Sequence, residues 1–327
     1  MFLDSLGAAL VYGCVVALLS IGFTLGHVSS DFPHLGLVQY SVVGAYIGYT
    51  VAEFFGLSPY LGLPIAFLGG GVNAAFYLIV VATLQRRGTK DVMLSISTLT
   101  GSFVMITFVA IYAFWVREAT GAFSMAFILE DAYAPIASLI VLVASALALR
   151  RLLSGTRLGA AGRGSAENSE LAMVCGVNPF RIQVFSWFVA GGLASMSGLL
   201  YTLQFVGDPY LWTALFTVTF AASFLGGIDS ALWAPMGALI TVSAQYAAET
   251  ALTAWGGRAR GALLMADSST LPLPHPLPRA GWPRRCPGEE KEHEVVPCCE
   301  AVSAANISAS SDVGQFHVEE GRSLSYL

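Results

Sequence analysis

The sequence predicts an all-α protein, a polytopic bundle of transmembrane helices, and three observations support this fold class. Hydrophobic residues make up 55% of the 327 residues and charged residues only 11%, with a mean hydropathy of +0.68. This is more apolar surface than a water-soluble domain can bury. The apolar residues also gather into eight separate segments, and these segments stop near residue 256.

Each apolar segment is expected to be a helix, because hydrocarbon offers no partner to an unpaired backbone group and about 20 residues are needed to cross it. The second, fifth and seventh segments are short, so re-entrant or interfacial helices are possible there. The first begins almost at Met1 without a basic flank, which favours a membrane span over a cleaved leader. In order, the segments cover 6–25, 35–51, 60–84, 92–116, 134–149, 182–206, 211–225 and 231–255.

The distribution of basic residues predicts the orientation. Arg86, Arg87 and Lys90 share one loop, and five arginines lie between residues 150 and 181, whereas the loop at 117–131 is mainly acidic. Basic loops favour the cytoplasmic side. Counting the spans back from the basic loops places the N-terminus outside, provided that segment 35–51 crosses the membrane. Eight spans would also leave residue 256 outside.

The predicted spans are rich in small residues, which allow helix backbones to approach closely. Examples are the runs at 69–71, 190–198 and 221–223. Close packing is sufficient to explain these runs without a further function. The glycines expected at helix contacts are Gly44, Gly198, Gly226, Gly227 and Gly237.

The loop at 150–181 is predicted to contain a short amphipathic helix. Ser165 can cap its start, and Gly176 can end it. Leu171, Val174 and Cys175 would form one apolar face. Such a face must be buried against the bundle, the bilayer surface or a partner protein.

The same loop resembles the cytoplasmic coupling segment of branched-chain amino acid ABC transporter permeases. That family has a pattern close to T-R-x-G-x-x-x-R-A, followed by a polar turn and A-x-x-x-G-I/V-N. The resemblance extends over about residues 6–255, including 44–46, 224–230 and 235–238. It departs from the family at 31–40, where the usual N-F-A-H-G motif is altered. The loop residues that match are Arg157, Gly159, Arg163, Ala172, Gly176, Val177 and Asn178.

The resemblance implies a multi-pass permease subunit in the cytoplasmic membrane of a prokaryote, importing branched-chain or related amino acids. Its implied partners are cytoplasmic ATPase subunits, a second permease subunit, an extracytoplasmic substrate-binding protein and membrane lipid, but no nucleic acid. The chain has no G-x-x-x-x-G-K-[ST] loop, so we expect no enzyme activity and no bound cofactor, with ATP used by partner subunits. The candidate ATPase-coupling residues are Arg157, Gly159, Arg163, Glu167, Leu171, Ala172, Gly176 and Val177.

Polar side chains inside the predicted spans are candidates for the translocation path. The alternative is that the hydroxyls bond to the preceding helical turn and the glutamines bridge helices. His27 and His34 are expected to be solvated loop residues. No grouping of Cys, His, Asp or Glu suggests a metal site. The path candidates are Gln39, Tyr40, Ser95, Ser97, Thr98, Thr100 and Gln204.

Other functions remain open from the residues alone. An ABC permease for urea, short amides or sugars would share this organisation, and a secondary transporter would share the hydropathy. The chain divides into a permease domain at 1–256, with its coupling loop at 150–181, and a Pro-rich tail at 257–327. The tail is expected to be disordered, or to result from a frameshift near Leu264 that removed a last span; a genuine lineage-specific tail is the alternative.

Overall fold

The computed structural model of the protein describes residues 2–30, 32–120, 127–129, 131–228, 231 and 233–255. Within these ranges the regular structure is helical, apart from one isolated antiparallel bridge between Phe127 and Gly207. The all-α prediction is therefore confirmed. The predicted tail at 257–327 lies outside the described residues, as do Asp229 and Ser230 of the family-like segment.

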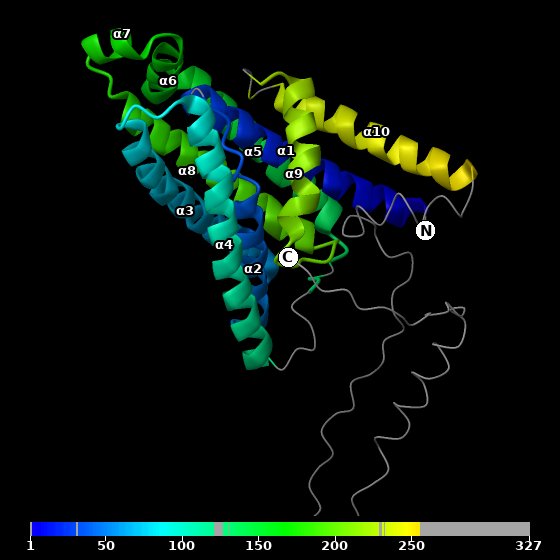
Figure 1. Cartoon of the computed structure of the whole chain (residues 1–327). Helices are drawn as coiled ribbons and strands as arrows, with labels where there is room; N and C mark the ends of the chain where they lie inside the picture. The colour runs from blue at the N-terminus through cyan, green and yellow to red at the C-terminus, as the bar shows by residue number, and fades with distance from the viewer. Residues whose placement is uncertain are drawn as a thin grey trace, which may run out of the picture. The chain divides into compact units, whose positions relative to one another are not determined.

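Each predicted apolar segment corresponds to one helix, and two further helices lie in the loop at 150–181 (Figure 1). A 3-10 turn, η1 (Pro59–Leu61), leads into the third helix. The helices are α1 (Phe2–Ser30), α2 (Gln39–Glu53), α3 (Gly62–Gln85), α4 (Asp91–Thr120), α5 (Ala134–Gly155), α6 (Arg157–Glu167), α7 (Ser169–Val174), α8 (Pro179–Thr202), α9 (Leu211–Gly226) and α10 (Ala234–Trp255).

Five stretches in the described part of the chain are long and apolar enough to cross a membrane: α1, η1 with α3, α4, α5 and α8. α9 is apolar but shorter, and α2 has only 15 residues. The fifth segment proved longer than expected, since α5 continues past Arg150 and Arg151 to Gly155. Arginine is a good helix former, and its long side chain can reach the polar edge of a bilayer.

α8 is the central helix of the bundle, and it packs against α1, α2 and α3. The small residues from Ala190 to Gly198 allow these helices to come close. A Cβ atom at Gly198 would overlap the backbone of Ser41, and one at Gly44 would overlap the backbone of Ser195. α2 and α8 therefore cross with their backbones in direct contact, which leaves no room for larger residues.

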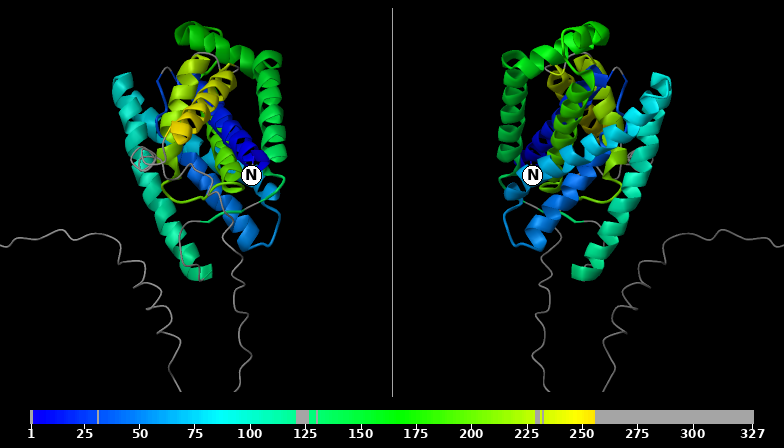
Figure 2. Two further views of the ribbon diagram at one scale, coloured as in Figure 1. Left: turned by 90° about the vertical axis from the view of Figure 1, so that its right-hand side faces the viewer. Right: turned by 90° about the vertical axis from the view of Figure 1, so that its left-hand side faces the viewer.

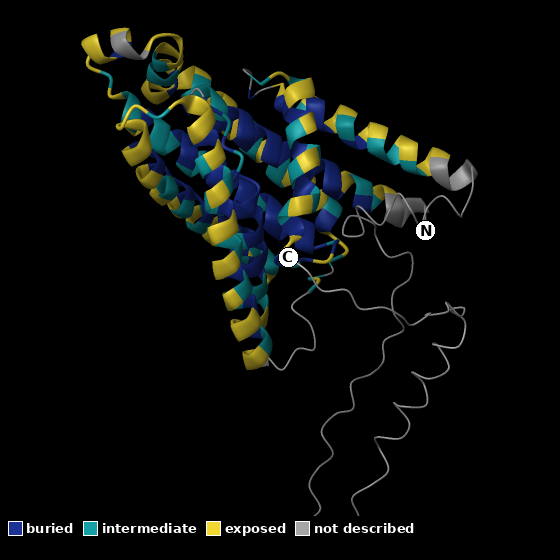
Figure 3. Cartoon of the chain, viewed as in Figure 1, coloured by how far each residue is buried: buried dark blue, intermediate teal, exposed yellow. Residues whose placement is uncertain are grey.

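The outer helices expose apolar side chains. Only 22% of the most apolar part of α4 and 11% of that of α5 are buried in the chain, against 72% of that of α8. Figure 3 shows this as frequent exposed positions along α4, with buried ones concentrated on the inner helices. Phe103, Phe108, Ile136 and Ile140 are among the exposed residues. Such surfaces match hydrocarbon or another apolar subunit rather than water.

The two basic regions lie at the same end of the bundle. The guanidinium carbon of Arg86, which follows α3, is 5.7 Å from the ring centre of Phe180 in the first turn of α8. At the other end of α8, the amide of Asp131 donates to the carbonyl of Leu203. The mainly acidic loop and the basic loops thus lie at opposite ends, as the orientation argument requires.

Candidate functional site

The loop at 150–181, which we call the coupling segment after its predicted role, contains two short helices, α6 and α7, rather than one. The backbone N–H of Gly159 donates to Thr156 Oγ1 over 3.1 Å, which caps the start of α6. The N–H of Leu171 donates to Asn168 Oδ1 over 2.9 Å, which caps α7. Gly176 follows with a φ of +84°, so the predicted end of the helix near this residue agrees with the structure.

The prediction that a helix begins at Ser165 is wrong. Ser165 lies inside α6, and its hydroxyl donates to the carbonyl of Gly162 over 3.0 Å. Thr156 provides an earlier cap, and the helix continues until Asn168 interrupts it. Two residues with good capping side chains therefore determine the boundaries.

α6 is held tightly against the end of α5. Gly159 is buried, and a Cβ atom there would overlap the carbonyl groups of Leu152 and Leu153. The Arg163 side chain donates to the carbonyl of Leu153. The short turn at Thr156 thus brings α6 back onto α5, and glycine at 159 makes the close contact possible.

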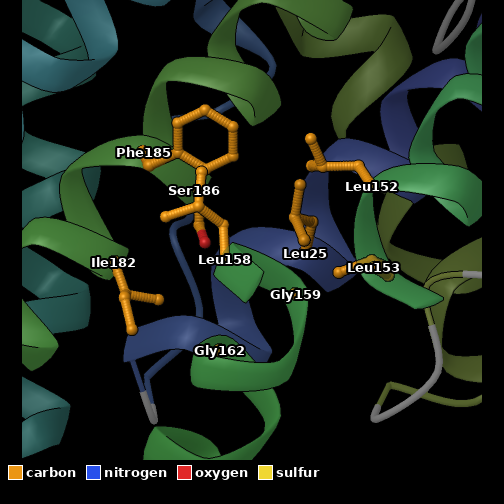
Figure 4. A pocket seen from close by; sticks show the side chains of 9 residues that line it. All are labelled: Leu25, Leu152, Leu153, Leu158, Gly159, Gly162, Ile182, Phe185 and Ser186. Carbon is orange, nitrogen blue, oxygen red and sulfur yellow. The ribbon is translucent and has the colours of Figure 1, made fainter. Parts of the chain in front are cut away.

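An apolar hollow lies beneath α6, where the coupling segment meets the ends of three spanning helices (Figure 4). Its lining comes from α1, α5, α6 and α8. A displacement of α6 would therefore act directly on three spanning helices. The lining side chains shown are Leu25, Leu152, Leu153, Leu158, Ile182, Phe185 and Ser186.

The outward face of α7 carries uncovered apolar side chains. Leu171 is 62% exposed and Val174 85% exposed, while Ala172 between them is buried. α6 and α7 lie across one end of the spanning helices (Figure 2). The predicted coupling residues divide accordingly: Gly159 and Ala172 face inward, Val177 is half-buried, and Arg157, Arg163, Glu167, Leu171 and Gly176 are exposed.

The break between α1 and α2 is the second candidate site. Residues 32–38 are not helical, yet Phe32, His34 and Leu37 are buried. The imidazole of His34 stacks on the indole of Trp187, with ring centroids 4.2 Å apart and planes 13° apart. The expectation that His34 is solvated is therefore wrong, because α8 covers the loop. His27 also lies in the last turn of α1 rather than in a loop.

A small pocket with several polar side chains in its lining lies beside this break, and we call it the His34 pocket. His34 Nε2 is 3.2 Å from the Tyr40 hydroxyl, and the backbone N–H of Leu35 donates to Thr98 Oγ1 over 3.1 Å. The pocket joins the break to α3 and α4. Its lining residues are His34, Gly36, Tyr40, Tyr77, Thr98, Gly101, Ser102 and Met105.

The structure brings some of the path candidates together and separates others. Tyr40 and Thr98 both line the His34 pocket. Gln39 is buried at the start of α2, and neither of its amide atoms has a hydrogen-bond partner among the described residues. Gln204 lies beyond the far end of α8. The hydroxyls of Ser95, Ser97 and Thr100 donate to the carbonyls of Asp91, Leu94 and Ile96 in their own helix.

Among the polar and aromatic residues of this pocket, sequence reasoning missed His34, Tyr77 and Ser102, as well as Trp187, which stacks on His34. Ser102 belongs to the same hydroxyl-rich run as Thr98 and could have been included. Tyr77 and Trp187 are aromatic residues within apolar spans, where packing is the usual role. Nothing local in the sequence distinguishes them from other aromatic residues.

At the opposite end, Phe127 packs against α2. The Phe127 ring centre lies 4.4 Å from that of Tyr49 and 5.1 Å from that of Tyr46. Phe127 and Gly207 also exchange two backbone hydrogen bonds, of 3.0 and 2.7 Å. Burial raises the pKa of the neighbouring Asp208 carboxyl, although backbone N–H groups of Tyr210 and Leu211 oppose this by bonding to it.

Comparisons with known proteins identify similar chains. The sequence model of the family described as "Branched-chain amino acid transport system / permease component" matches residues 5–266. The "Probable branched-chain amino acid transport permease protein LivH" of Methanocaldococcus jannaschii is 27% identical over 231 residues, which cover 68% of this chain and 73% of the relative.

Two bacterial relatives show the same similarity at lower identity. The "High-affinity branched-chain amino acid transport system permease protein LivH" of Escherichia coli K12 is 24% identical over 261 residues, covering 73% of this chain and 83% of the relative. The protein of the same description from Salmonella typhimurium is 23% identical over 261 residues, with the same coverage. No solved structure matches the chain.

Proposed function

The chain belongs to the permease components of branched-chain amino acid transport systems, and from this membership we propose that it carries branched-chain amino acids across the cytoplasmic membrane of a prokaryote. The names of the archaeal and bacterial relatives support this substrate class. The apolar helices and the family agree on a multi-pass membrane protein. The chain is a transporter subunit.

The observation that carries the mechanistic part of the proposal is the exposed apolar face of α7. Leu171, Met173 and Val174 lie uncovered at the basic end of the bundle, where a cytoplasmic protein could bind them. A partner that covers this face removes apolar surface from water, at roughly 25 cal/mol per Å². We propose that the partner is a pair of ATPase subunits, which bind and use the ATP.

The attachment of α6 explains how such a partner would act. Gly159 and Arg163 hold α6 against the end of α5, and the hollow beneath α6 borders α1 and α8. A force on the coupling segment would therefore be transmitted to α1, α5 and α8. Closure of the ATPase pair would then bias the bundle between inward-open and outward-open arrangements. The second permease subunit and an extracytoplasmic binding protein complete the proposed importer.

We also propose that the substrate passes close to the His34 pocket. Tyr40 and Thr98 line it, and Ser95, Ser97 and Thr100 lie on the same helix as Thr98. Gln39 adjoins Tyr40 at the start of α2. Gln204, at the other end of α8, would belong to the extracytoplasmic part of the path.

The proposal is tested by co-expressing the chain with candidate ATPase subunits, a second permease subunit and a binding protein from the same organism. The purified complex is reconstituted into liposomes with ATP, and uptake of labelled leucine, isoleucine and valine is measured against urea, a short amide and ribose. Saturable, ATP-dependent uptake of the three amino acids is expected. Transport of urea, amide or sugar instead, or uptake without ATP, would overturn the assignment.

A further inference from the structure

A compact group of buried apolar residues separates the His34 pocket from the cytoplasmic end of the bundle. We call it the gate cluster; it is a second core, distinct from the main one, and consists of Phe32, Leu78, Val81, Leu94 and Trp187. Leu78 and Val81 lie in the last two turns of α3, and Leu94 lies in the first turn of α4. The cluster therefore lies directly beneath the basic connection between α3 and α4.

The His34 pocket lies deeper along the same helices. Its α4 residues Thr98, Gly101, Ser102 and Met105 follow Leu94 by up to eleven positions. At about 1.5 Å per residue, they extend roughly 6 to 16 Å further from the cytoplasmic end. On α3, Tyr77 of the pocket likewise precedes Leu78 of the cluster.

Most hydroxyl protons around the pocket are already donated to backbone carbonyl groups. Tyr77 donates to the Ser97 carbonyl over 2.7 Å, Ser102 to the Leu99 carbonyl over 2.6 Å, and Thr98 to the Ser95 carbonyl over 2.7 Å. Their oxygens keep lone pairs and can only accept further hydrogen bonds. This is the arrangement that an ammonium group would need.

The His34–Tyr40 pair supplies a donor whichever ring nitrogen of the neutral imidazole carries the proton. If Tyr40 donates to Nε2, the proton is on Nδ1, and Nδ1 has no partner in the described part of the chain. If Nε2 donates instead, the Tyr40 O–H is left to donate elsewhere. Either state leaves one proton donor next to the hydroxyl acceptors, and a carboxylate could accept from it.

Among the described residues, those that line the pocket carry no formal charge when His34 is neutral. A buried site that offers both hydroxyl acceptors and a proton donor suits a group that carries both charges and no net charge. As described, the pocket has room for about one water molecule. The described arrangement is therefore closed, and a larger occupant requires the surrounding helices to move apart.

We propose that the His34 pocket holds the zwitterionic end of the transported amino acid and that the gate cluster closes this site from the cytoplasm. This inference rests on the proposed function. The pocket contributes acceptors for the ammonium group and a donor for the carboxylate. The gate cluster must separate before the substrate can leave.

Trp187 connects the gate to the coupling segment. Its Nε1–H donates to Ser30 Oγ over 2.5 Å, and its ring stacks on His34. It stands in the first half of α8, whose first residues, from Pro179 to Arg181, form the end of the coupling segment. A movement of that segment would displace Trp187 from its contacts with the α1–α2 break.

The test uses thiol labelling of the assembled importer in inside-out vesicles. The five natural cysteines are replaced by alanine, transport is verified, and Ser102→Cys is introduced. A membrane-impermeant methanethiosulfonate reagent is then added to the cytoplasmic face without nucleotide. Slow labelling is expected, and Trp187→Ala or Leu94→Ala should accelerate it at least tenfold. Phe108→Ala, on the exposed face of α4, is the control that should leave the rate unchanged.

Ligand protection tests the chemistry of the site in the Leu94→Ala vesicles. Leucine should slow labelling of Ser102→Cys, whereas isovalerate and isoamylamine, which carry only one of the two charges, should protect at least tenfold less well. Equal protection by leucine, isovalerate and isoamylamine would overturn the proposal. An absence of protection by leucine would also overturn it and would indicate that the pocket holds only an ordered water molecule. Unchanged rates in both gate variants would overturn the gate.

Leucine uptake by the same complex distinguishes a failure of the pocket assignment from a failure of the proposed function. If leucine is transported but does not protect, the pocket assignment alone fails. If leucine is not transported while another solute is, the proposed function fails. Native-like elution of each variant complex in size-exclusion chromatography excludes misfolding as the cause of faster labelling.

Discussion

The indole of Trp187 and the imidazole of His34 form a nearly parallel stack, with planes 13° apart. The contact joins α8, whose first residues lie in the coupling segment, to the irregular backbone between α1 and α2. Non-helical backbone at membrane depth is tolerated where protein buries it or where it lines a cavity. Here both conditions hold, since Trp187 covers the loop and the His34 pocket lies beside it.

Replacing Leu171 with aspartate should uncouple ATP turnover from transport. The side chain is largely exposed on α7, and a charge there would have to lose water when the ATPase binds. We expect at least a tenfold loss of substrate-stimulated ATPase activity and of leucine uptake in proteoliposomes. Leu171→Met retains the apolar contact and should remain close to the natural protein. Normal stimulated activity of the aspartate variant would exclude this docking surface.

Replacing Gly198 with alanine should destabilise the bundle. The new methyl group would overlap the backbone of Ser41, so α2 and α8 would have to separate, at a cost of about 1–3 kcal/mol or more. The measurement is the thermal unfolding midpoint in detergent. Gly26→Ala in α1 is the matched control, because no atom in the described part of the chain lies within 4 Å of its Cβ position. That variant should be neutral or slightly more stable.

Replacing Gly176 with alanine should loosen the end of α7. Its φ of +84° lies in a region that costs a residue with a Cβ roughly 1–2 kcal/mol. Hydrogen–deuterium exchange of residues 169–178 should accelerate, while exchange in α8 stays the same. Gly176→Asn should show a smaller effect, because asparagine adopts this conformation more readily. Equal exchange in all three proteins would show that the turn does not depend on glycine.

Replacing Phe127 with alanine should loosen the extracytoplasmic end of the bundle. The ring packs against Tyr46 and Tyr49, and its loss favours arrangements open on that side. A reagent added from outside should label Thr50→Cys several-fold faster in this background. Phe55→Ala, which removes an exposed ring near the same end, is the control. A similar acceleration in both would indicate a general loosening.

The helices could be predicted from the sequence because lipid imposes a minimum length of apolar residues on each span. The family-like residues also predicted a coupling role for the loop at 150–181, and that role stays a prediction. Its helix boundaries were missed because Ser165, Thr156 and Asn168 are all capable caps, and only the path of the chain determines which of them act. The glycines at 44 and 198 could be identified as packing residues but not paired with their contacts.

The His34 pocket could be predicted only in part. The hydroxyls of α4 and Tyr40 were visible as polar residues in apolar surroundings. The polar stretch around His34 gave no sign of burial, because the residues that bury it come from a distant part of the chain. Trp187 donates a hydrogen bond to Ser30, which is 157 positions away in the sequence. Burial of a loop depends on such long-range contacts, which local composition does not encode.

The crossing of α2 and α8 at Gly44 and Gly198 suggests how a small rotation becomes a large displacement. With backbones in contact, the two helices cannot move closer, but the angle between them can change. Pro179, at the start of α8, is nineteen residues from Gly198, which is roughly 28 Å along the helix axis. A turn of about 10° around this pivot would move the cytoplasmic tip of α8 by about 5 Å. The two glycines thereby let a small change in the crossing angle produce a much larger displacement at the start of α8.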